Sequence, residues 1–104
     1  MIYHVNKENF ERAVLKSPVP VLVDFFATWC GPCRMQAQIL ERYEKLHGED
    51  EVRLVKIDCD EEQELVGQYR VETIPTLLVF RNGELTERVS GVRRENELDR
   101  LLGL

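Results

Sequence analysis

The sequence predicts one α/β domain, residues 1–104, in which helices cover both faces of a central mixed β-sheet. Strand-like and helix-like segments alternate in the order β-α-β-α-β-α-β-β-α, which predicts parallel strands joined by right-handed crossovers. Residues 19–26 are apolar on both alternating faces, as expected for a central strand that is covered on two sides. Asn82-Gly83 is a strong hairpin signal, so the last two strands should run antiparallel.

The first quarter of the chain should form a strand, a helix and then the central strand. Residues 2–5 are a short candidate strand, and Asn6 can cap a helix over residues 7–16. Pro18 should end this helix, because the residue before a proline avoids helical geometry. The central strand over residues 19–26 follows directly.

The rest of the chain repeats these patterns and closes with the hairpin and a helix. Gly48 is the expected stop of the helix that follows the central strand, and Gly91 breaks the chain before the last helix. The expected segments are a long helix that begins at the cysteines and runs as far as Gly48, a strand over 52–58, a short acidic helix over 60–69, strands over 76–80 and 84–89, and a last helix that carries Leu98, Leu101 and Leu102.

The composition argues against two classes of partner. The formal net charge is −5 and the basic residues are dispersed among acids, whereas a nucleic-acid-binding surface must be basic. No apolar run approaches the roughly 18 residues that a membrane-spanning helix needs. Residues 1–8 lack the charged-then-apolar pattern of a secretory signal, so a cytoplasmic location is expected.

The chemistry is expected in the segment Trp29-Cys30-Gly31-Pro32-Cys33. Two cysteines three residues apart at the start of a helix can meet on one helical face. The unpaired N–H groups and the positive dipole end of that helix favour a thiolate, which predicts Cys30 as the nucleophile and Cys33 as the resolving thiol. The alternatives are a structural disulfide or half of a zinc site, although no other cysteine or histidine has ligand-like spacing to the pair.

Two blocks of the sequence resemble the thioredoxin family. Residues 26–35 are similar to its active-site segment, and residues 71–83, which include Ile74-Pro75-Thr76, are similar to its second block. The resemblance covers essentially the whole chain and implies the thioredoxin fold and a thiol–disulfide oxidoreductase that reduces protein disulfides. Gly31-Pro32 between the cysteines resembles the reducing members of the family more than its oxidants or isomerases.

Asp24 is a single acid inside an apolar strand. Burial without a partner should raise its pKa, which suits it to accept a proton from Cys33, and it matches the family's buried aspartate. An aspartate at a wet strand edge is the alternative, against which the flanking Val23 and Phe25 argue. Lys56 matches the family's lysine near that acid, although by itself it could equally be an exposed strand lysine.

A second group of residues is expected to bind the substrate chain. The resemblance implies a cis Ile74–Pro75 bond that faces the cysteines and exposes the backbone of Thr73 and Ile74 for pairing with an extended substrate; an ordinary strand-entry proline is the alternative. Gly31 leaves room for a partner chain, and Pro32 stiffens the loop. Trp29 is expected to cap the disulfide and to form an apolar docking patch with Pro32, Ile74, Gly91 and Val92.

Three residues depart from the simplest pattern. Cys59 most simply packs as a small hydrophobe at the end of a strand, with a regulatory or dimerising role left open. Gln38 stands where many family members have a helix-kinking proline, so this helix should run straighter. Arg94 stands where a Ser or Thr cap usually begins the last helix, and its charge should leave that end frayed.

The resemblance also implies how the protein is used. It predicts a monomer without a bound cofactor or metal, whose partners are disulfide-containing client proteins and a thioredoxin reductase, with electrons reaching it indirectly from NADPH through that flavoprotein. A rival hypothesis is a binding module in which the cysteines are incidental, but a scaffold has no chemical need of the paired cysteines, Asp24 and Pro75. The nearer rival is an oxidant or an isomerase.

Overall fold

Five strands form one mixed sheet in the order β1-β3-β2-β4-β5 in the computed structural model, which describes residues 1–104. β1 and β2 pair in parallel with β3, whereas β4 pairs antiparallel with both β2 and β5. The predicted order of elements and the mixed sheet are confirmed. The elements are β1 (Ile2–His4), η1 (Glu11–Leu15), β2 (Val21–Phe26), α1 (Gly31–Leu46), β3 (Arg53–Asp58), α2 (Gln63–Gln68), β4 (Thr76–Arg81), β5 (Glu84–Ser90) and α3 (Glu95–Leu102).

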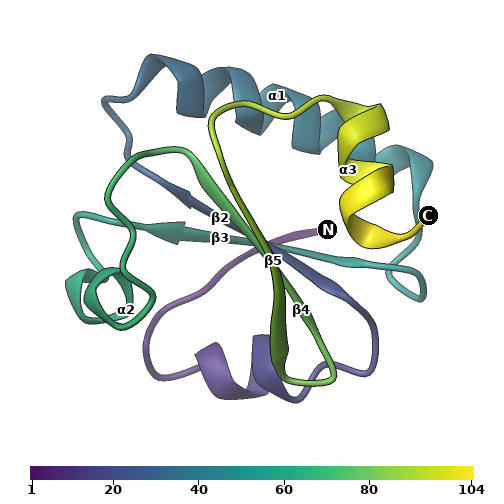
Figure 1. Cartoon of the computed structure of the whole chain (residues 1–104), viewed down its shortest axis with the longest axis horizontal. Helices are drawn as coiled ribbons and strands as arrows, with labels where there is room; N and C mark the ends of the chain where they lie inside the picture. The colour runs from purple at the N-terminus through teal and green to yellow at the C-terminus, as the bar shows by residue number, and fades with distance from the viewer.

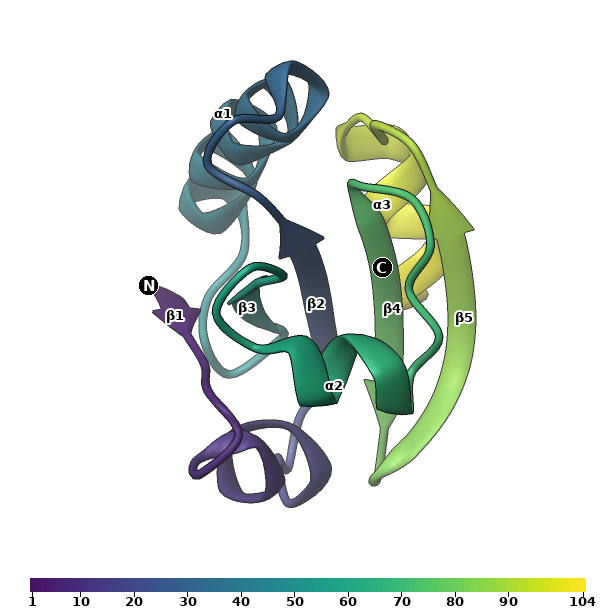
Figure 2. The same ribbon diagram turned by 90° about the vertical axis from the view of Figure 1, so that its left-hand side faces the viewer.

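Helices cover both faces of the sheet, and each face has its own apolar core. Figure 1 shows α1 and α3 above the sheet and η1 and α2 below it, and Figure 2 shows the same layers from the side. Leu22 of β2 packs with Tyr43 of α1 and Leu98 of α3, whereas Val23 packs with Val14 of η1. Successive residues of β2 therefore face opposite cores, as the apolar pattern of this strand predicted.

The predicted helix over residues 7–16 is wrong in its extent and type. The side chains of Asn6 and Asn9 each accept a hydrogen bond from the other's backbone N–H, at 3.0 and 2.8 Å, and hold residues 6–9 in a turn. These reciprocal bonds are those of a capping box, so Asn6 caps the first turn as predicted, although the turn does not continue as a regular α-helix. The helix that follows, η1, is a π-helix, in which the N–H of Lys16 donates to the carbonyl of Glu11.

Several predicted boundaries also move by one or two residues. β2 begins at Val21, because Pro20 offers no N–H for the sheet. α1 ends at Leu46 with the next residue extended, so the helix stops before Gly48. α2 is shorter than predicted, because Asp58 accepts a hydrogen bond from the N–H of Asp60 and forms a turn there.

The structure shows the surroundings of Gln38 on α1 and of Arg94 before α3, the two residues that depart from the family's pattern in the helices. Gln38 is exposed on α1, which continues as an α-helix from Gly31 to Leu46. At the start of α3 the side chain of Glu97 accepts a hydrogen bond from the N–H of Arg94 at 3.3 Å. Glu97 thus supplies part of the cap that a Ser or Thr would provide, while fraying of this end stays a prediction.

None of the helices combines the length and apolar character that a bilayer crossing requires.

The hairpin between β4 and β5 has the turn that its sequence predicted. Asn82 and Gly83 both have positive φ, at 52° and 82°, as a type I′ turn requires. A Cβ added at Gly83 would lie 3.0 Å from the carbonyl oxygen of Leu15, so the turn also packs closely against the end of η1. Only glycine meets both demands without strain.

Replacing Gly83 by alanine should therefore destabilise the protein. The left-handed backbone by itself costs roughly 1–2 kcal/mol for a residue with a Cβ, and the contact with Leu15 adds to that cost. Gly67→Ala is the matched control: it lies inside α2 with open space around its Cβ, and should be neutral or stabilising by up to about 1 kcal/mol. Urea unfolding of both variants measures this, and equal effects would contradict the turn geometry.

Candidate active site

Cys30 and Cys33 lie where β2 leads into α1. Cys30 is the N-cap residue of α1, with extended backbone, and Cys33 lies in the first helical turn. Their sulfurs form a disulfide, with the Cα atoms 5.2 Å apart. The N–H of Cys33 points at Cys30 Sγ, 3.2 Å away. An unpaired helical N–H thus reaches the first sulfur, which is the contact that favours a thiolate there in the reduced protein.

The two cysteine residues differ slightly in exposure, in the order that the sequence predicted. Cys30 is 6% exposed and Cys33 is 2% exposed, so a partner reaches the first sulfur more easily than the second. Both pack with Ala27, and the half-buried Phe26 and Ile74 cover them. Cys30 is nonetheless largely enclosed, because these apolar side chains pack around it.

Asp24 is fully buried, at 0% exposure, and neither of its carboxylate oxygens has a hydrogen-bond partner. It lies two residues from Leu22 in β2 and therefore on the face that α1 covers. Burial raises the pKa of Asp24 to about 7, with the nearby Lys56 acting in the opposite direction. The expected burial of Asp24 is confirmed, and the wet strand edge is not what the structure shows.

Lys56 is the neighbour of Asp24 across the β2–β3 pair, at the matching register position. Its Nζ lies 4.2 Å from the ring centre of Phe26 and forms no ion pair within 4.0 Å of a carboxylate. The side chain is half-buried, with its charge over an aromatic face. Lys56 thus lies beside the buried acid, as the resemblance implied.

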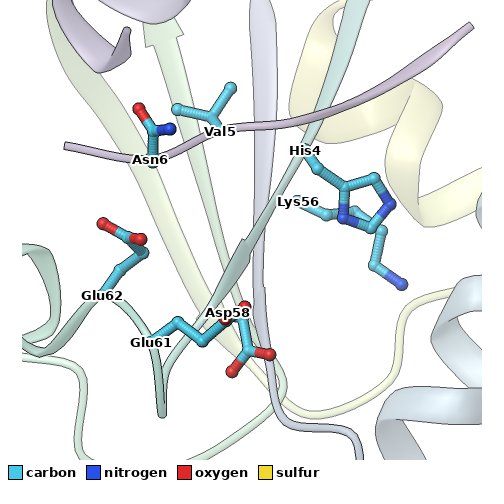
Figure 3. A pocket seen from close by; sticks show the side chains of 7 residues that line it. All are labelled: His4, Val5, Asn6, Lys56, Asp58, Glu61 and Glu62. Carbon is cyan, nitrogen blue, oxygen red and sulfur yellow. The ribbon is translucent and has the colours of Figure 1, made fainter. Parts of the chain in front are cut away.

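Two hollows meet at Lys56. One, of about 200 Å³, is also lined by Cys33 and Phe26. The other, of about 260 Å³, lies beside β1, and Figure 3 shows the imidazole of His4 next to the Lys56 stem with the carboxylate of Asp58 farther along. Lys56 is the one residue that lines both hollows. No three His, Cys, Asp or Glu side chains come together in a metal-binding group.

The residues predicted to bind substrate come from three separate segments around Cys30. The Ile74–Pro75 bond is cis, and the carbonyl oxygen of Ile74 lies 4.0 Å from Cys30 Sγ. Thr73 is exposed and Ile74 half-buried. The N–H of Gly91 donates to the carbonyl of Pro75 at 2.9 Å, which ties the third segment, with the half-buried Val92, to the second. Gly31 and Pro32 are exposed, and a Cβ at Gly31 would meet nothing within 4 Å.

Trp29 is exposed, and a residue that the sequence did not single out fixes it. The side chain is 68% exposed, and its indole N–H donates to a carboxylate oxygen of Asp60 at 2.9 Å. Asp60 belongs to an acidic stretch before α2 that also contains Asp58 and Glu61. The contact between Asp60 and Trp29 depends on the turn at Asp58, and nothing in the sequence predicts that contact.

Cys59 lies apart from the redox pair. It is half-buried at the end of β3 and packs against the core on the η1 face. Burial, together with the negative charges of the neighbouring Asp58 and Asp60, raises the pKa of its thiol to about 11. Little thiolate therefore forms at neutral pH, which agrees with a packing role for Cys59.

The comparison with known families assigns this arrangement. The family model described as Thioredoxin matches residues 1–103. The chain belongs to the thioredoxin family. It is 42% identical over 102 residues to the thioredoxin of Listeria monocytogenes, which covers 98% of this chain and 96% of the relative. The thioredoxin of Rickettsia bellii is 42% identical over 98 residues, or 94% and 92% of the two chains.

A third thioredoxin relative comes from a cyanobacterium. Thioredoxin 1 of Synechococcus elongatus is 41% identical over 87 residues, or 84% of this chain and 80% of the relative. Together with the neighbouring cysteine pair, family membership makes this thioredoxin a thiol–disulfide oxidoreductase that acts on protein disulfides. The chain is therefore an enzyme and not a scaffold with incidental cysteines.

Asp24→Asn should stabilise this thioredoxin at neutral pH but not in acid. The folded-state pKa of about 7 lies above the ordinary value of 3.8, so between these values the folded protein holds a proton that the unfolded chain has released. Wild-type stability therefore falls as the pH rises through this window. Near pH 8 the variant should be more stable by up to roughly 4 kcal/mol, at about 1.36 kcal/mol per pKa unit.

Urea unfolding at several pH values between about 4 and 8 measures this difference. Glu61→Gln is the control, because Glu61 is exposed and a surface substitution should change stability by less than about 0.5 kcal/mol. A stability difference between Asp24→Asn and wild type that stays constant over this pH range would show that Asp24 does not titrate as a buried group.

Proposed function

We propose that this thioredoxin reduces protein disulfides, with Cys30 as the attacking thiol and Cys33 as the resolving thiol. The observation that carries the proposal is the Cys30 sulfur at the N-cap of α1, within reach of the Cys33 N–H and on the same side of the sheet as the unpaired Asp24. A lowered thiol pKa at this place raises the thiolate fraction at neutral pH and keeps the sulfur nucleophilic.

The reaction proceeds in two thiol–disulfide exchanges. The Cys30 thiolate attacks one sulfur of a client disulfide, so that a mixed disulfide forms, the client bond breaks and one client sulfur leaves as a thiolate. Cys33 then loses its proton and attacks Cys30 Sγ. The Cys30–Cys33 bond forms, the second client thiolate leaves, and two electrons have passed to the client. The disulfide in the structure corresponds to this final state.

Asp24 is the proposed acceptor of the Cys33 proton. A carboxyl group with a pKa of about 7 is partly ionised at neutral pH, so it can take up a proton and release it again. The positive charge of Lys56 favours the carboxylate form and keeps Asp24 available as a base. Lys56 also lines both hollows, and these give solvent a way toward the lysine that lies opposite the buried acid in the β2–β3 pair.

The client polypeptide is proposed to bind across the three segments around Cys30. Its extended backbone would pair with Thr73 and Ile74, while the exposed faces of Trp29, Gly31 and Pro32 receive the residues beside its cysteine. Gly91 and Val92 complete the opposite side of this docking patch. A small apolar patch that binds mainly through backbone pairing contacts few side chains of the client, so it should accept a broad range of clients.

The wider setting follows from family membership. We expect residues 1–104 to work as one monomeric domain without a bound cofactor, in the cytoplasm. Oxidised protein would be recharged by a thioredoxin reductase, a flavoprotein that takes electrons from NADPH. Nucleic acid and membranes are not expected partners, given the net charge of −5.

Cys30→Ser should abolish reduction of insulin disulfides in the presence of dithiothreitol, because it removes the attacking sulfur. Cys33→Ser should instead accumulate mixed disulfides between Cys30 and client cysteines, which peptide mass spectrometry identifies. Cys59→Ser is the matched control and should keep full activity, because that thiol is half-buried and largely protonated. Full activity of Cys30→Ser, or client linkage mainly through Cys59, would contradict the assignment.

The direction of the reaction has its own test. Gly31-Pro32 between the cysteines supports a reducing potential, so equilibration with glutathione should give a value near roughly −270 mV, which is typical of thioredoxins in general. The fraction of the oxidised protein is followed by alkylation of the free thiols. A potential near roughly −120 mV, as in strong oxidants, would make the protein an oxidant instead.

A further inference from the structure

Gln36 is a buried polar side chain on α1 that the proposed reaction does not use. It lies one turn after Cys33 and is 0% exposed. Its amide nitrogen donates to the carbonyl of Arg93 at 3.0 Å, and its amide oxygen accepts from the N–H of the same residue at 2.7 Å. The side chain therefore pairs with both backbone groups of one residue, as a neighbouring strand would.

The segment that Gln36 binds is the loop 91–94 between β5 and α3, which carries Val92 of the docking patch. One end of this loop is tied to Pro75 by the N–H of Gly91. The Arg93 guanidinium donates to the carbonyl of Ser90 at 2.8 Å and pairs with Glu97 at 3.4 Å, which closes the loop on itself. The backbone of Arg93 is held by Gln36 alone.

Val92 thus lies between two anchored residues. Gly91 is hydrogen-bonded to Pro75, and Arg93 is hydrogen-bonded to Gln36 of α1, the helix that begins at the catalytic cysteines. An apolar residue at position 36 would satisfy the core, since Ile39 and Leu40 follow on the same buried side of α1. A buried amide costs free energy unless it makes hydrogen bonds. Here both hydrogen bonds of the Gln36 side chain go to Arg93, in the same loop as Val92. The packing of α1 therefore does not explain Gln36, whereas the position of the loop does.

We propose that Gln36 is a positioning residue that holds the Val92 loop at a fixed distance from Cys30 and so sets the affinity for polypeptide disulfides. The proposal rests on the function proposed above and deepens it. Gln36 touches neither the sulfurs nor the client. Without it, the loop occupies its binding-competent position for only part of the time, and the apparent affinity for a client falls by that fraction. A small disulfide that needs only the Cys30 sulfur is unaffected.

The test compares Gln36→Met, which keeps the length and shape of the side chain, with Gln38→Met, an exposed glutamine on the same helix without a side-chain hydrogen bond. Insulin reduction regenerated by dithiothreitol gives KM and kcat, and reduction of hydroxyethyl disulfide reports the bare sulfur chemistry. For Gln36→Met we expect the insulin KM to rise about tenfold with kcat within about twofold, as expected if the competent loop population falls to roughly one tenth. The rate with hydroxyethyl disulfide should not change, and Gln38→Met should match wild type in all three quantities.

Amide hydrogen exchange gives an independent readout of the loop. The Arg93 N–H should exchange about tenfold faster in Gln36→Met, while the Cys33 N–H should keep its wild-type rate. Gln36→Glu keeps the acceptor for the Arg93 N–H and loses the donor, so its insulin KM should lie between those of wild type and Gln36→Met. If Gln36→Met does not fold, Gln36→Glu carries the test, and a wild-type insulin KM in it overturns the proposal.

The outcomes separate this proposal from the one it rests on. The positioning role is overturned if folded Gln36→Met has the wild-type insulin KM, or if it loses activity equally toward insulin and hydroxyethyl disulfide. In either case the proposed function stands as long as the wild-type protein reduces both substrates. Wild-type protein that reduces neither substrate overturns the proposed function itself.

Discussion

The amino end of α1 is the constraint on which the rest of the structure depends. A helix leaves its first N–H groups without partners, and here one of them reaches the Cys30 sulfur. The preceding strand, which is the central one of the sheet, has to place that sulfur just beyond its carboxyl end, and the helix has to place Cys33 within its first turn. The two apolar cores serve this purpose, because they fix β2 and α1 relative to each other from both faces of the sheet.

The protein keeps polar groups in places where apolar ones would stabilise it better. Asp24 lies in the middle of a buried strand with no hydrogen-bond partner, which is a costly arrangement for a structural residue. Gln36 is equally buried, but its amide nitrogen and its amide oxygen each make a hydrogen bond with the Arg93 backbone. The two buried polar groups on the α1 side therefore differ in kind: Asp24 is left unsatisfied, whereas Gln36 joins α1 to a segment that is distant in the sequence.

The surface around Cys30 is assembled from parts that are far apart in the chain. The start of α1, the segment before β4 and the loop before α3 meet there, joined by the Gly91–Pro75 hydrogen bond and by Gln36. Trp29 belongs to the same surface, and its orientation depends on Asp60, which lies beyond β3. Each of these ties is made between segments separated by at least 16 positions, so local sequence preference does not create them. They exist only because the sheet order β3-β2-β4 brings the segments to one end.

The sequence by itself determined the order of elements, the central place of β2, the type I′ turn at Asn82-Gly83 and the pairing of Cys30 with Cys33, because each follows from periodicity or from spacing within a few residues. Burial of Asp24 could be inferred for the same reason, since its strand neighbours are apolar. What only the tertiary structure decided were the contacts of Trp29 with Asp60 and of Gln36 with Arg93, and the π-helical form of η1. Side-chain bonds between distant segments leave no periodic trace, and the cap at Asn6 marks where the first helical segment begins but not whether its turns are α-helical or π-helical.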